Sequence, residues 1–150
     1  MAKDSPLDDP LITTFGRLVE AAGRLQRSVG QVLAERSTLP LGWFEVLFRL
    51  ARSDDGRMTM GALAGQIVLT TGGVTRLIDR MESAGLVTRQ PCPTDRRVSY
   101  AVITEEGFAK VEQAAGVHAV ELRAVFAGFS ARDLGTLDRL LDRLRTLPEN

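Results

Sequence analysis

Two adjacent glycines stand near the start of a stretch that otherwise has the pattern of an amphipathic helix, TTGGVTRLIDRMESAGLVTR at residues 70–89. A glycine inside a helix costs about 1 kcal/mol relative to alanine. Close approach of another molecule is one reason to keep Gly72 and Gly73. A helix N-terminus without bulky side chains exposes free backbone N–H groups and the positive end of the helix dipole, and both favour an anion such as phosphate.

The helical spacing of this stretch divides its residues into two sides. Val74, Leu77, Ile78 and Met81 are spaced i, i+3, i+4, i+7 and are expected to face inward. The other side is free of large apolar side chains and suits the major groove of DNA, which is about 12 Å wide. The residues expected to contact DNA are Thr70, Thr71, Gly72, Gly73, Thr75, Arg76, Asp79 and Arg80. The alternative is that the glycines pack against the preceding helix at a tight corner.

A second basic feature is DRR at residues 95–97, within the turn-prone stretch PCPTDRR. An arginine at a hairpin tip fits a narrow minor groove, where negative potential is concentrated. We therefore expect DNA contacts from Arg96 and Arg97. Asp95 would repel phosphate, so its expected role in the site is to hold an arginine, Arg80 or Arg97, in a fixed rotamer. On its own the turn would be read as a solvated surface loop, but its place beside the glycine-led helix favours a binding role.

The elements that position these residues lie between about 40 and 104. A helix is expected from Pro40 or Leu41 to the turn at 54–56, then a short extended piece, and then a short helix from a Thr59 cap to Ile67. Next come the glycine-led helix, capped by Thr70 or Thr71 and ended by Gly85, and two strands within LVTRQ and VSYAVIT, the second with Val98, Tyr100 and Val102 on one face. This order is typical of a winged helix-turn-helix, which places one helix in a groove.

Both ends of the chain carry apolar stripes with the 3–4 spacing of coiled coils. We expect a long helix at 8–36 and two further helices within 105–147, the last capped by Ser130. The first stripe is Leu11, Phe15, Leu18, Ala22, Leu25, Val29 and Val32, and the later ones are Phe108, Val111, Ala115, His118, Leu122, Val125 and Phe129, then Leu134, Leu137, Leu141 and Leu144. Such stripes bury best against a second copy, so the chain ends predict one dimerisation layer. The expected fold is mainly α (α+β).

Length and charge agree with one domain that has a basic centre. The chain has 150 residues and equal numbers of basic and acidic residues, 19 each. Residues 57–104 contain six arginines and three acidic residues, a net charge of +3, which leaves −3 for the rest. Only two of the basic residues are lysines, so arginine is expected to make the anion contacts.

Other classes of protein find little support in the sequence. A single histidine, a single cysteine and no GxxxxGK loop argue against an enzyme, and we expect neither a metal nor a cofactor. Cys92 ends the first wing strand. Arg89 and Arg96 could lower its pKa, but it is expected to be a bystander. No secretion signal or apolar run of about 18 residues is present, which predicts a cytoplasmic protein without a membrane partner. The main alternative to DNA binding is a winged helix used for protein–protein contact.

The sequence resembles the MarR family of transcriptional regulators over nearly its whole length. The resemblance rests on LAGQI, on TTGGVTRLIDRMESAGLVTR, on PTDRRVSYAVITEEG and on FSARDLGTLDRLLDRL. The departures from the family pattern are mild: Met81 replaces a leucine and Ile103 precedes the threonine of ITEEG. The resemblance implies that residues 1–150 are one MarR-like domain with a winged helix-turn-helix at 40–104. It also implies that Arg97 is the wing arginine and Asp95 its supporting acid.

The resemblance further implies a homodimer whose two recognition helices enter successive major grooves of a palindromic operator in double-stranded DNA. Many members are repressors whose DNA affinity is lowered by small aromatic or anionic effectors. The effector cleft would lie between the dimerisation helices and the winged module. By that resemblance, the candidate lining residues here are Phe15, Arg17, Trp43, Phe44 and His118. For Phe44 and Phe48, a role as ordinary core is the favoured interpretation.

Overall fold

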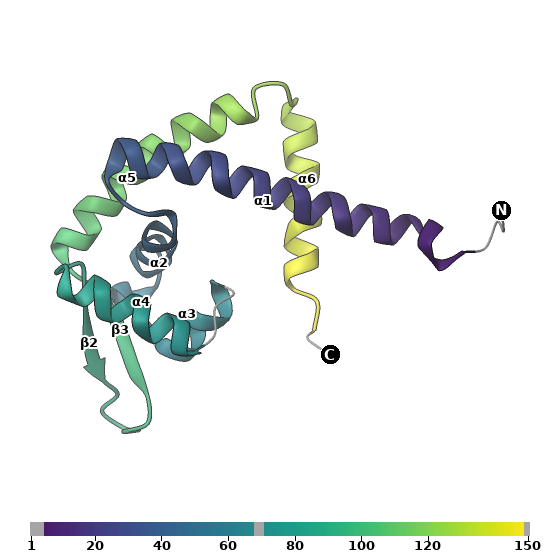
Figure 1. Ribbon diagram of the computed structural model, residues 1–150. Helices are drawn as coiled ribbons and strands as arrows, with labels where there is room; N and C mark the ends of the chain where they lie inside the picture. The colour runs from purple at the N-terminus through teal and green to yellow at the C-terminus, as the bar shows by residue number, and fades with distance from the viewer. Residues whose placement is uncertain (1–4, 68–70, 149–150) are drawn as a thin grey trace.

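The computed structural model describes residues 5–67 and 71–148, and for Thr71 only the backbone (Figure 1). The helices are α1 (Pro10–Ser37), α2 (Leu41–Ala51), α3 (Met60–Gln66), α4 (Thr71–Ser83), α5 (Glu105–Val125) and α6 (Ala131–Arg145). The strands are β1 (Arg57–Thr59), β2 (Val87–Pro91) and β3 (Ser99–Ile103), and 3-10 turns lie at Pro6–Asp8 and Asp54–Gly56. The predicted order of elements from 40 to 104 is confirmed.

Several helix ends have the caps that the sequence predicts. The hydroxyl of Thr59 accepts a hydrogen bond from the Ala62 N–H at 3.2 Å and begins α3. Ser130 and Asp133 form a reciprocal capping box at the start of α6. Gly85 has φ +76° and ends the turn after α4, as predicted. The predicted cap of α4 by Thr70 or the Thr71 side chain lies outside the described residues.

The three strands form an antiparallel sheet in the order β1–β3–β2. Val87 pairs with Ile103 and Pro91 with Ser99, so β2 and β3 form a hairpin that projects away from the helices (Figure 1). On β3 the face with Tyr100 and Val102 is half-buried, and the fully buried residue is Ala101 on the opposite face. The hairpin is the predicted wing.

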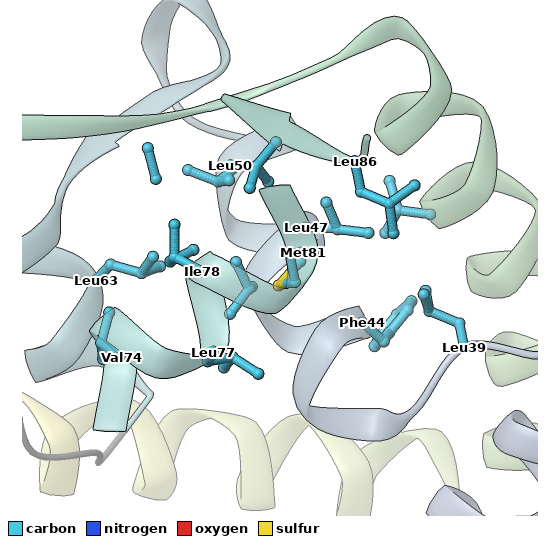
Figure 2. Packing of buried hydrophobic residues seen from close by; sticks show 14 of the residues in the cluster. Leu39, Phe44, Leu47, Leu50, Leu63, Val74, Leu77, Ile78, Met81 and Leu86 are labelled. Carbon is cyan, nitrogen blue, oxygen red and sulfur yellow. The ribbon is translucent and has the colours of Figure 1, made fainter. Parts of the chain in front are cut away.

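The core lies between α2, α3, α4 and the sheet, and is completed by Leu33 of α1 and by Val111 and Ala114 of α5. Figure 2 shows side chains from these elements meeting one another, among them Leu47, Leu63 and Ile78, each fully buried. Val74, Leu77, Ile78 and Met81 are all buried, which confirms the predicted inward side of α4. Full burial of a side chain of this size contributes about 1.5–3 kcal/mol, so this side fixes the rotation of α4 about its own axis.

The chain ends leave apolar surface uncovered. The C-terminal half of α1 buries Val29 and Leu33, but Leu11 and Phe15 in its N-terminal half are 74% and 67% exposed. The α6 helix buries no residue. Its exposed apolar side chains are Leu137, Leu140, Leu141 and Leu144. The stripes predicted at both ends are therefore present, but most of their surface is not buried within one chain.

Helix α5 only partly follows its predicted stripe. Val111 and Ala114 are buried, whereas Phe108 is 47% exposed. Phe129 lies beyond the end of the helix and is also exposed. No helix within residues 5–67 and 71–148 is long and apolar enough to cross a lipid bilayer.

Candidate nucleic-acid interface

The outward side of α4 is open to solvent, as the sequence predicts. Gly72, Arg76 and Arg80 are exposed, and a β-carbon added at Gly72 would meet no atom of the described residues within 4 Å. Packing against the preceding helix therefore does not explain Gly72. Gly73 is half-buried and lines a shallow hollow together with Arg76, Leu77, Asp79 and Arg80. The surface around the first turn of α4 can thus be approached closely by a partner.

Asp79 has a different environment from the one that the sequence suggested. It lies on the exposed side, but its Oδ1 is 2.6 Å from the Arg89 guanidinium on β2. Arg89 was not among the residues predicted for the site. A hydrogen-bonded carboxylate beside an arginine is held in place and its charge is compensated, so Asp79 connects α4 to the wing.

The wing tip is an ordered turn. The Cys92 N–H donates to the Val98 carbonyl and the Val98 N–H to the Asp95 carbonyl, both at 3.0 Å. Asp95 Oδ1 accepts from the Arg97 N–H at 2.9 Å and lies 3.4 Å from its Nε. Of the two arginines considered for Asp95, the structure brings Arg97 to it. The Arg97 side chain stays 91% exposed, so its base is fixed while the guanidinium remains available to a ligand.

Cys92 lies at the foot of this turn. Its Sγ is 3.3 Å from Thr94 Oγ1. Hydrogen bonding from Thr94 lowers the pKa of the Cys92 thiol. The pKa is therefore lowered, as the sequence suggested, but Arg89 and Arg96 are not the cause; Arg89 instead binds the acids of α4.

The corner behind α4 connects the wing to α5. The Thr104 hydroxyl donates to the Gly85 carbonyl at 2.7 Å and accepts from the Gly107 N–H at 3.0 Å. The Thr104 N–H donates to the Leu86 carbonyl at 3.1 Å. A β-carbon at Gly107 would overlap that same Leu86 carbonyl oxygen. The threonine and glycine of ITEEG therefore bring α5 against the turn that ends α4.

Arg49, like Arg89, makes contacts near α4 that the sequence did not predict. Its guanidinium donates to the Glu45 carbonyl at 2.9 Å and to the Gln66 carbonyl at 3.1 Å. The second bond satisfies a carbonyl at the end of α3, immediately before the helix-turn-helix corner. The only signal in the sequence was an arginine in the predicted helix 41–51, and its partner was not identifiable from spacing.

The residues predicted for an effector cleft are only partly brought together. The Phe44 and His118 rings lie 4.8 Å apart, and Trp43 packs at the edge of the core. Burial lowers the pKa of His118, although the Glu45 carboxylate opposes this shift, and its Nδ1 is buried without a hydrogen-bond partner in the described chain. Phe15 and Arg17 instead lie on the exposed N-terminal half of α1, which extends beyond the winged module (Figure 1).

Phe44 is core, as expected, at 5% exposed, but the same expectation for Phe48 is wrong. Phe48 is 37% exposed: its ring stacks on Phe44, and the Arg52 guanidinium lies 5.2 Å from its ring centre. Within the described residues, no group of three or more histidine, cysteine, aspartate or glutamate side chains is arranged to hold a metal ion.

The arrangement of α3, α4 and the wing is similar to that of a known family. A MarR family model (MarR_2) matches residues 37–98. The fold also matches the crystal structure of AbsC, a MarR family transcriptional regulator from Streptomyces coelicolor. That match has a TM-score of 0.80 and 28% identity, over 94% of this chain and 95% of AbsC. In sequence over residues 37–98, and in fold over nearly its whole length, the chain is similar to MarR family transcriptional regulators.

Two further similar proteins are informative. Sco3205 from Streptomyces coelicolor, solved in complex with DNA, matches with a TM-score of 0.79 and 26% identity over 88% of this chain and 86% of its own. The transcriptional regulator MhqR of Bacillus subtilis is 29% identical over 89 residues, which are 59% of this chain and 61% of MhqR. The chain spans about three fifths of the length of the curated relatives that it matches.

Proposed function

We propose that this protein is a sequence-specific transcriptional regulator of the MarR family that binds double-stranded DNA through α4 and the wing. The observation that carries the proposal is the exposed, arginine-bearing side of α4 beside a hairpin whose Arg97 is held by Asp95. The DNA complex of Sco3205, a relative with the same fold, supports it. The proposed contacts are Thr70, Thr71, Gly72, Gly73, Thr75, Arg76, Arg80, Arg96 and Arg97, with Asp79 and Asp95 as supporting acids.

The proposed active form is a homodimer on a palindromic operator. The exposed apolar side chains of α1 and α6, such as Phe15 and Leu141, support this assembly because nothing in the described chain buries them. Residues 8–36 and 105–147 would form the dimerisation layer and 40–104 the DNA-binding module. A dimer would present two copies of α4 to one face of the duplex, with half-sites about one helical turn apart.

The proposed output is repression that a small aromatic or anionic effector relieves. The cleft residues would be Trp43, Phe44 and His118, since the latter two rings already touch. Phe15 and Arg17 would contribute only in an assembly that brings α1 of a second copy nearby. A regulator of this kind would act in the cytoplasm and would need no catalytic activity.

Substitution of Gly72 by alanine is expected to weaken DNA binding without destabilising the protein. A β-carbon at this position has free space, and alanine is the better helix former, so the melting temperature should stay the same or rise. A methyl group between the helix and the groove should lower affinity by about tenfold, the size of one lost contact. Thermal unfolding and a gel shift measure the two effects. Unchanged affinity for DNA would mean that Gly72 is not part of the DNA-binding surface of the protein.

Substitution of Arg97 by alanine tests the wing. It should weaken binding to most sequences and reduce the slope of log affinity against log salt by about one counterion. The matched control is Arg24→Ala, which removes an exposed arginine that pairs with Glu20 on α1. The control should keep the wild-type slope. If Arg97→Ala also keeps it, the wing arginine contacts no phosphate and the protein–protein alternative gains support.

A further inference from the structure

Arg89 connects the wing to the proposed recognition helix through several bonds at once. Its Nη2 is 2.6 Å from Asp79 Oδ1 and donates to the Thr75 carbonyl at 3.2 Å. Its Nη1 is 3.9 Å from Glu82 Oε2, and its backbone N–H donates to Glu82 Oε1 at 3.1 Å. The planar, forked guanidinium is suited to several acceptors at fixed angles, which a lysine ammonium is not.

The partners of Arg89 all lie along one strip of α4. Positions 75, 79 and 82 are spaced i, i+4, i+7, so they follow one side of the helix over two turns. Arg89 itself is on β2, where it pairs with Ala101 of the central strand. One side chain therefore joins two turns of α4 to the sheet, and it sets the angle between the helix and the hairpin that carries Arg97.

The same contacts change the charge of the surface. Asp79 and Glu82 lie on the helix proposed to approach a polyanion, and alone they would repel phosphate. The Arg89 side chain is only 31% exposed, so solvent screens it less than a fully exposed arginine. Its single positive charge offsets one of the two negative charges of these carboxylates. Arg76 and Arg80, whose neighbours in the shallow hollow include Asp79, then dominate the outward surface.

We propose that Arg89 is a positioning residue for DNA recognition. It fixes α4 relative to the wing and partly offsets the negative charges of Asp79 and Glu82, so that α4 and Arg97 can contact the same duplex. Arg89 acts through these groups and makes no contact with the bases. This inference rests on the proposed function, since it assigns a role within the DNA-binding surface.

The test is a double-mutant cycle on full-length protein, with a duplex selected by the wild type and a scrambled duplex of the same length. Discrimination is the ratio of the two affinities. Arg89→Ala and Asp79→Ala should each lower discrimination by about tenfold or more, and the double variant should lose no more than the worse single variant. Asp79→Ala is informative in sign, because loss of a carboxylate that only repelled phosphate would raise affinity.

Three further measurements sharpen the test. Arg89→Lys retains the charge and should fold. A single ammonium lacks the forked geometry with which the guanidinium contacts both the Thr75 carbonyl and Asp79, so discrimination between the two duplexes should still fall. The Arg24→Ala control should match the wild type. The salt slope of Arg89→Ala should stay close to the wild-type value, because no phosphate contact is removed.

Additive losses in the cycle, or a salt slope reduced by one counterion in Arg89→Ala, would make Arg89 a direct phosphate contact and overturn the proposal. Wild-type discrimination in both Arg89→Ala and Arg89→Lys would also overturn it. A wild-type protein that prefers no duplex at all would instead contradict the proposed function. The two failures are therefore distinguishable.

Discussion

Substitution of Gly107 by alanine is expected to lower the free energy of unfolding by about 3 kcal/mol. This is the upper end of the destabilisation seen when an added group is forced into space that is already filled. The new β-carbon would overlap the Leu86 carbonyl oxygen, which cannot easily move because it accepts the Thr104 N–H. The better helix propensity of alanine returns only about 1 kcal/mol. For a chain of this length the melting temperature should fall by about 6–12 °C.

Gly42→Ala is the matched control, since Gly42 also lies in the first turn of a helix but has no atom within 4 Å of an added β-carbon. Thermal unfolding of both variants should show loss of stability only for Gly107→Ala. Equal melting temperatures would mean that α5 does not approach the turn after α4 as closely as described.

Substitution of Leu141 by glutamate is expected to convert the proposed dimer into a monomer and to reduce operator affinity by about 100-fold, because two linked half-sites bind far more tightly than one. Leu141 lies in the middle of α6 and is 41% exposed, and no residue of α6 is buried within the chain. A charge placed in this stripe would have to be buried without a partner on association. Sedimentation velocity and a gel shift measure the two effects.

Arg139→Glu serves as the control for this substitution. Residue 139 is two positions from 141 and therefore lies on nearly the opposite side of the helix. This variant also introduces a glutamate into α6, yet it should stay dimeric. If the Leu141→Glu protein remains a dimer and binds the operator with wild-type affinity, then α6 is not part of the dimer interface.

The sequence was most informative where one local rule sufficed. The i, i+3, i+4, i+7 spacing identified the buried side of α4, from Val74 to Met81, and Gly85 identified its end. Burial of that side leaves one orientation for the outward residues. The pairing of Asp95 with Arg97, one of the two arginines considered for it, is also a short-range contact, because both residues lie in one tight turn.

Contacts between distant segments were not predictable in this way. Arg89 and Asp79 are ten positions apart and on different elements, so no helical or strand period relates them. Gly107 was part of a recognised motif, but its reason, the Leu86 carbonyl, appears only once the chain is folded. Phe48 was expected in the core because it is apolar. Its residue type does not reveal which side of α2 is left uncovered by other elements.

The central claim is that two chains together present α4 and the wing to one DNA duplex. The most direct test is selection of duplexes from a random pool by the purified full-length protein. We expect an enriched inverted repeat whose half-sites lie about one helical turn apart, bound by two chains. Enrichment of a single half-site bound by one chain, or no enrichment over the starting pool, would contradict the account.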